Sequence, residues 1–114
     1  MTPGDKARLT QSLELPGAAA WCICTAAHAF EHHAYTDWFK PTQLEAMMLK
    51  LAGAMEGLRQ RQIEPVQMCW VFEHARLFLV ARADGDMLGL FVENRAGLNF
   101  SAHRAALADF AAGD

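Results

Sequence analysis

The chain has 114 residues, enough for one domain that buries a hydrophobic core without metal ions or disulfide bonds to hold it together. Hydrophobic residues make up 53% of it and charged residues 20%, a balance that excludes an intrinsically disordered chain. The formal net charge is −3 and the ten Lys and Arg residues are scattered, which excludes the clustered basic face that nucleic-acid binding requires. We therefore expect a single globular domain over residues 1–114.

The sequence also bears on cellular location. No stretch approaches the roughly 18 consecutive apolar residues of a membrane-spanning helix, and residues 1–17 lack the apolar core of a signal peptide. The three cysteines are an odd number, which is typical of a reducing compartment. Cys22 and Cys24 lack the further ligands of a metal site, so they are interpreted as small core residues. These features predict a cytoplasmic protein with no membrane span.

The N-terminal third is predicted to hold one short helix and two strands. Residues 4–15 have approximate helical spacing, and the Pro-Gly pair at 16–17 ends that helix. The segment 18–26 is apolar on both faces, so we expect a strand inside the sheet with cover on each side. Residues 30–36 are more polar and predict an edge strand. Small side chains on one face of segment 18–26 leave room for a closely packed helix: Ala18, Ala20, Cys22, Cys24 and Ala26.

A long amphipathic helix is predicted next. Thr42 and Glu45 have the spacing of a capping box, so Thr42 is expected to cap the helix. Arg59 and Arg61 fall in the last turn, where positive charge complements the helix dipole. The apolar residues recur at the spacing of one helical face: Leu44, Met47, Met48, Leu51, Ala52, Met55 and Leu58.

Three strands in a row and a final helix complete the chain. The strands are predicted at 66–74, 76–82 and 87–93, and Asp84-Gly85 supplies the positive φ angles of a hairpin turn. The last two strands are apolar on both faces and are therefore expected to be central. The final helix is expected to be capped by Asn99 or Ser101, to end before Gly113, and to bury Phe100, Ala106, Leu107 and Phe110.

The predicted order is α-β-β-α-β-β-β-α. A sheet that is apolar on both faces and has only three helices must carry the long helix on one face and the terminal helices on the other. This order resembles the roadblock/LC7 family, whose fold is profilin-like and close to that of longin domains. Three features carry the resemblance: the Pro-Gly break before a small-residue strand, the long helix directly before the three strands, and the segment 88–107, "LGLFVENRAGLNFSAHRAAL".

The resemblance implies an α+β fold with a five-stranded antiparallel sheet of order 2-1-5-4-3. It also implies a homodimer or heterodimer formed by the third strand and the long helix. The function that it implies is regulation of small Ras-like GTPases, or an adaptor role in motor complexes.

In that strand order the third strand is an edge, and it carries no Lys or Pro that would discourage pairing with another strand. Pairing with its own copy across a two-fold axis would continue the sheet and set two long helices side by side. The long helix is broad enough to have a second, partner-facing side. The interface predicted from these considerations comprises Val66, Met68, Cys69, Trp70, Val71 and Glu73 on the strand, and Met47, Lys50 and Glu56 on the helix.

The aromatic pair Trp38-Phe39 precedes the long helix and has two interpretations. If exposed, it would anchor an interface. We favour a hydrophobic plug under the sheet, which is the commoner use of such a pair.

Candidate catalytic and metal-binding groups are less convincing. His28, Glu31, His32 and His33 lie close in sequence, but on a strand His32 and His33 point to opposite faces. A metal site needs at least three ligands around one ion, so these residues are interpreted as solvated hairpin side chains. His103 is expected to be partly exposed in the first turn of the final helix.

No framed nucleophile and no phosphate-binding loop are found either. Cys69 and His74 lack a third, orienting group, and Cys69 is interpreted as a core residue.

We therefore predict a non-enzymatic, dimeric regulatory or scaffolding protein with no catalytic, cofactor-binding or metal-binding residues. A small Ras-like GTPase or an adaptor protein is its expected partner. Two alternatives stay open. A small-residue strand beneath a Met-rich helix could enclose a ligand, as in PAS-like or GAF-like sensors, and the histidine cluster could serve a metal-dependent enzyme.

Overall fold

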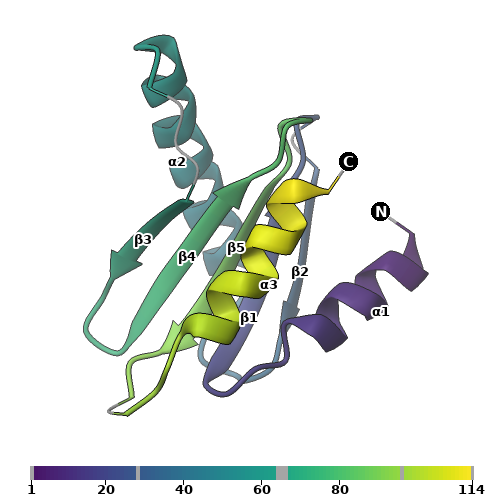
Figure 1. Cartoon of the computed structure of the whole chain (residues 1–114), viewed down its shortest axis with the longest axis vertical. Helices are drawn as coiled ribbons and strands as arrows, with labels where there is room; N and C mark the ends of the chain where they lie inside the picture. The colour runs from purple at the N-terminus through teal and green to yellow at the C-terminus, as the bar shows by residue number, and fades with distance from the viewer. Residues whose placement is uncertain (1, 28, 64–66, 96, 114) are drawn as a thin grey trace.

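The computed structural model describes residues 2–27, 29–63, 67–95 and 97–113. Its elements follow the predicted order and form one five-stranded antiparallel sheet of order β2-β1-β5-β4-β3, so both predictions are confirmed. Figure 1 shows α2 on the far face of the sheet and α1 and α3 on the near face. The bounds are α1 Pro3–Ser12, β1 Ala18–Cys24, β2 Phe30–Ala34, α2 Pro41–Gln60, β3 Gln67–Val71, β4 Ala75–Ala81, β5 Met87–Glu93 and α3 Ser101–Ala112.

The layer between α2 and the sheet depends on small residues, as the sequence predicts. Cys22 and Cys24 of β1 pack with the apolar stripe of α2, whose Met48 and Met55 are fully buried. Gly89 of β5 allows the closest approach, because a Cβ atom there would lie 2.9 Å from the sulfur of Met48. A larger residue at position 89 would therefore push α2 away from the sheet.

The other layer packs α1 and α3 against the large side chains of the central strands. Trp21, Phe78 and Leu107 are buried in it, and full burial of each such side chain contributes roughly 1.5–3 kcal/mol to folding. None of the residues of α1 is fully buried. That helix is held partly by Thr10, whose hydroxyl accepts a hydrogen bond from Trp21 Nε1 at 3.1 Å and whose carbonyl accepts one from the Tyr35 hydroxyl.

The strict alternation predicted for β1 is wrong at its first residues. The pairing of β1 with β5 shifts register between Ala18 and Ala20, which marks a β-bulge. Because a bulge inserts one extra residue into a strand, Ala18 lies in the α1–α3 layer while Ala19 and Ala20 lie under α2.

The predicted start of the long helix is also wrong. The helix begins at Pro41, and Lys40 occupies the N-cap position. The Gln43 side chain accepts a hydrogen bond from the Lys40 backbone N–H at 2.9 Å. Proline is favoured at the first helical position, where no backbone N–H is needed, and this preference outweighed the capping pattern of Thr42 and Glu45. Arg59 lies in the last turn as predicted, whereas Arg61 is the C-cap residue.

His103 of α3 is buried, with 1% of its surface exposed, so the expected partial exposure is wrong. Its Nε2 atom lies 2.8 Å from the carbonyl oxygen of Pro16, and its ring contacts Phe100. His103 faces the segment between α1 and β1, because α3 packs beside that segment. The apolar side predicted for α3 is confirmed, and Gly113 is its C-cap. The predicted N-cap at Asn99 or Ser101 is wrong, because Phe100 occupies that position and the Asn99 side chain accepts a hydrogen bond from the Ser101 N–H instead.

Candidate protein-interaction surface

The free edge of β3 presents backbone groups that β4 leaves unused. The Phe72 N–H donates to the Ala75 carbonyl at 2.8 Å, which makes these two residues a hydrogen-bonded pair. In an antiparallel ladder, hydrogen-bonded and non-hydrogen-bonded pairs alternate. The N–H and C=O groups of Gln67, Cys69 and Val71 therefore point away from β4, toward the open edge of the sheet.

The side chains of these residues lie on the face that carries α3. This helix packs on β4, and Cys69 and Val71 stay exposed, Val71 by 66%. The expectation that Cys69 is a core residue is therefore wrong. Met68 and Trp70 point to the other face, where they pack against the core beneath α2 and are half-buried. The edge thus combines an open hydrogen-bonding ladder with an apolar, exposed side chain.

The part of the predicted interface that lies on α2 is divided between core and surface. Met47 is half-buried and packs against the core, whereas Lys50 and Glu56 are exposed. Leu49, which was not predicted, is 47% exposed. The outer side of α2 is therefore open to solvent and partly apolar.

Glu73 and Val66 are the remaining residues of the predicted interface. Glu73 is exposed in the turn between β3 and β4. Val66 lies outside the described residues. Gln67 was omitted from the predicted set, although it alternates with Cys69 and Val71 and its backbone faces the open edge. Its polar side chain did not suggest an interface, but the two-residue period of the strand places it on the same side as Cys69 and Val71.

The aromatic pair before α2 is divided rather than acting as one plug. The Phe39 ring packs against that of Phe91, with 4.8 Å between the ring centroids. Trp38 is 45% exposed. Phe39 is therefore the hydrophobic plug that was expected, and Trp38 is exposed, as an interface anchor would have to be.

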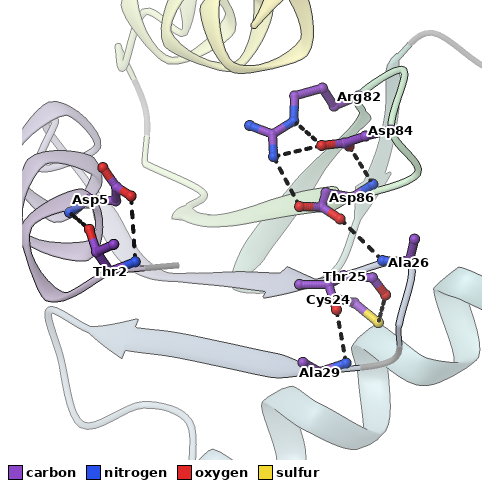
Figure 2. Close-up of polar contacts among 9 residues, drawn as sticks. All are labelled: Thr2, Asp5, Cys24, Thr25, Ala26, Ala29, Arg82, Asp84 and Asp86. Atoms are coloured by element: carbon purple, nitrogen blue, oxygen red, sulfur yellow. Dashed lines mark hydrogen bonds and ion pairs between the residues drawn. The ribbon is translucent and has the colours of Figure 1, made fainter. Parts of the chain in front are cut away.

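The sequence did not predict a polar cluster at the end of the sheet that carries the β1–β2 and β4–β5 turns. Figure 2 shows Arg82 between the carboxylates of Asp84 and Asp86, at 3.0 Å and 2.9 Å. The second oxygen of Asp86 accepts a hydrogen bond from the Ala26 N–H at 3.1 Å, which joins the β4–β5 turn to the β1–β2 turn. The hydrogen bond from Arg82 holds the pKa of Asp84 below its usual value. The guanidinium also lies 4.6 Å above the ring of Phe110 in α3.

This cluster joins three segments: the β4–β5 turn, the β1–β2 turn and α3. The spacing of Arg82, Asp84 and Asp86 around Gly85, whose φ is +95°, was read only as a turn. Arg82, Asp84 and Asp86 reach one another because the backbone of the hairpin brings these alternate residues to one side.

The histidines that suggested a metal site point apart. His32 stacks on Phe30 and His33 contacts Tyr35, on opposite faces of β2. His74 is exposed in the β3–β4 turn beside Glu73. Among the described residues, which do not include His28, no group of three or more His, Cys, Asp and Glu side chains is arranged to hold a metal ion.

The space that suggested a sensor pocket is filled. Met48 and Met55 occupy the region between β1 and α2. A hollow of about 510 Å³ lies at the end of this layer, between α2 and the β4–β5 turn, with Leu49, Glu56 and Arg59 on its walls. Its walls also include Cys24, Met55 and Met87, so it reaches between α2 and the end of the sheet. Over the described part of the chain, the helices are too short or too polar to cross a membrane.

Comparisons with known proteins place this fold. No protein-family model matches the sequence, and no curated protein is similar to it in sequence. Solved structures are similar in fold. MglB from Myxococcus xanthus superposes with a TM-score of 0.64 at 16% identity, over 91% of this chain and 86% of that one. A structure described as MglB with a tetrameric arrangement gives a TM-score of 0.68 at 15% identity, over 97% and 90% of the two chains.

A third similar structure names the family. The roadblock/LC7 domain from Streptomyces avermitilis superposes with a TM-score of 0.66 at 13% identity, over 92% of this chain and 87% of that one. The strand order is the one that the sequence resemblance implies, and the three helices lie on the faces predicted from the apolar pattern of the strands. The chain therefore has the fold of the roadblock/LC7 family.

Proposed function

We propose that this chain is a non-enzymatic regulatory or scaffolding module, formed by a single domain, that dimerises through β3 and α2 and acts on a small Ras-like GTPase. The observation that carries the proposal is the open edge of β3, where three residues direct their N–H and C=O groups outward. Unpaired edges promote strand addition, and natural proteins usually guard them with Lys, Pro or a bulge. The described part of β3 carries none of these.

Two further features support self-association. Antiparallel pairing of two β3 strands would form a continuous ten-stranded sheet (five from each copy) with the α2 helices on the same face. A related fold, MglB, is described in a tetrameric arrangement, so the scaffold supports assembly in at least one relative.

Oligomeric state tests the dimer directly. Light scattering on the purified chain should give twice the 12.6 kDa mass of one copy. Val71→Lys or Cys69→Lys places a charge on the paired edge and should give a folded protein of half the wild-type mass. His32→Lys on β2, the opposite edge of the sheet, is the matched control and should leave the mass unchanged. A dimer that survives both β3 substitutions would place the interface elsewhere.

Thiol crosslinking tests the pairing of β3. Cys69 is exposed and near the middle of β3, whereas Cys22 and Cys24 are buried. Burial raises the pKa of Cys22 to about 12, so its thiol stays protonated and unreactive near pH 8. A short bifunctional thiol reagent should therefore join two copies through Cys69 alone. Failure to crosslink a protein that light scattering shows to be dimeric would argue against antiparallel β3 pairing.

The GTPase partner requires a separate experiment. Wild-type chain and its Val71→Lys variant would be used to capture proteins from native lysate, followed by binding measurements with the recovered GTPase loaded with GDP or a non-hydrolysable GTP analogue. The proposal expects a Ras-like GTPase that binds the wild type and distinguishes the two nucleotides. A partner set without any GTPase would contradict that part of the proposal and leave the dimer untouched.

A further inference from the structure

A surface pocket of about 640 Å³ lies between the segment that leads into α2 and the β3–β4 turn. Trp38 and Phe39 form one wall. His74, Ala75, Glu93 and Asn94 form the other, so the pocket joins aromatic rings to a carboxylate. It lies outside the residues of the predicted interface, although Glu73 of that set is the neighbour of His74.

The aromatic wall is held firmly on one side and open on the other. Phe39 packs on Phe91 in the core beneath α2. Trp38 is 45% exposed, so its ring is available to a partner. An exposed indole beside a fixed phenyl ring is costly to leave in water, and such positions often anchor a side chain of another protein.

The opposite wall is made rigid by Asn94. Its Nδ2 atom donates to the carbonyls of Phe72 and Ala75 at 2.6 and 3.1 Å, and its Oδ1 atom accepts from Arg76 Nε at 2.9 Å. The Asn94 N–H also donates to the His74 carbonyl at 3.0 Å. These bonds fix the β3–β4 turn against the end of β5, so the pocket is formed before anything binds.

Charge decides what the pocket suits. Glu93 is the acidic residue among its walls, and two further acidic residues, Asp37 and Glu73, are the sequence neighbours of Trp38 and His74. Three cations lie nearby. Arg76 binds Asn94 and lies 4.2 Å above the Phe100 ring, so it is engaged on the face of the sheet that carries α3. Lys40 is two residues beyond Trp38, and the Nη1 atom of Arg95 lies 3.9 Å from Glu93. Arg95 is 53% exposed and makes this contact at long range, so it can turn into solvent and leave the carboxylate to a ligand.

We propose that this pocket binds an arginine side chain of a partner protein. A guanidinium stacks on an indole face and donates in a planar fork to a carboxylate, and Trp38 with Glu93 offers both. The proposal deepens the protein-interaction role given above, but it does not depend on pairing of β3. Its failure and the failure of dimerisation are therefore separately visible.

The probe is the capped peptide acetyl-Gly-Arg-Gly-amide, titrated at millimolar concentrations into the ¹⁵N-labelled full chain. The Trp38 indole N–H signal reports on the pocket, and that of the buried Trp21 serves as internal control. The same peptide with citrulline in place of arginine has nearly the same shape but no charge. We expect the arginine peptide to shift the Trp38 signal in a saturable way, and the citrulline peptide to bind at least several-fold more weakly.

Substitutions in the pocket test which of its residues bind the arginine peptide. Glu93→Gln should weaken arginine binding several-fold and make the two peptides similar, whereas Glu31→Gln on β2 should leave binding unchanged. Trp38→Phe should weaken binding, followed through the backbone signals of residues 93 and 94. Equal binding of the two peptides to the wild type, or no shift at all, would overturn the proposal. A monomeric chain that still selects arginine would overturn dimerisation and leave the pocket standing.

Discussion

Asp86 accepts a hydrogen bond from the backbone N–H of Ala26, a residue 60 positions earlier in the chain. Through its other oxygen the same carboxylate binds Arg82. One side chain thus ties together two turns at one end of the sheet. Substitutions of Asp86 can separate the contribution of the hydrogen bond to Ala26 from that of the ion pair with Arg82.

Asp86→Ala removes both contacts and leaves the Ala26 N–H without this partner. We expect a loss of about 1–2 kcal/mol in the free energy of unfolding, measured with urea. Asp86→Asn keeps an oxygen that can accept from Ala26 but loses the charge that binds Arg82, so it should cost less. Equal losses in the two variants would mean that the bond to Ala26 contributes nothing.

Asp84 predicts a response to acid. The hydrogen bond from Arg82, reinforced by one from the Asp86 N–H, holds the pKa of Asp84 below the 3.8 of a free carboxyl. A carboxylate whose pKa is lower in the folded state stabilises that state above the unfolded pKa, and this contribution disappears as the pH falls through the folded value. An NMR titration of the Asp84 carboxyl should therefore give a value below 3.8. Arg82→Met should return it toward 3.8, and an unchanged value would rule out the arginine as the cause.

Replacing Gly89 and Gly53 with alanine should change the stability of the protein in opposite directions. A Cβ atom at Gly89 would lie 2.9 Å from Met48 Sδ and 3.1 Å from Leu77 Cδ1, so Gly89→Ala should cost about 1–3 kcal/mol. A Cβ atom at Gly53 in α2 meets nothing within 4 Å. Gly53→Ala should raise stability by about 0.5–1 kcal/mol, because alanine favours a helix interior. Thermal unfolding of the two variants checks both signs, and a neutral Gly89→Ala would mean that Met48 moves freely.

Replacing the buried His103 should have a large effect on stability. His103→Ala opens a cavity beside Phe100 and removes the partner of the Pro16 carbonyl, so we expect a loss of about 2–4 kcal/mol. His74→Ala is the matched control, because the His74 side chain is 84% exposed, and it should change stability by less than about 0.5 kcal/mol. Similar losses at both positions would mean that burial of His103 does not matter for folding.

Most of the fold could be predicted from the pattern of apolar residues. The period of the α2 stripe and the two-sided apolar character of β1, β4 and β5 predicted the elements and their layers, because burial leaves a regular pattern in the sequence. The strand order came from the resemblance, since periodicity does not say which strands are neighbours.

Other features depend on contacts that a linear pattern does not contain. The burial of His103 arises because α3 meets the segment after α1, and the bulge at Ala18–Ala20 arises from the pairing of β1 with β5. The pocket beside Trp38 joins residues from three separate segments. In the sequence, only the aromatic pair itself indicated it.

The place of Thr10 has a consequence for the N-terminal helix. Trp21 and Tyr35 both direct polar atoms out of an apolar layer, and both find their acceptors on this one residue. Removing α1 would leave the indole N–H and the phenol O–H without these acceptors, next to hydrophobic surface. Each would cost about 1–3 kcal/mol wherever water cannot reach it. Helix α1 has no fully buried residue, so the two acceptors of Thr10 make it part of the folded core in a way that its packing alone would not.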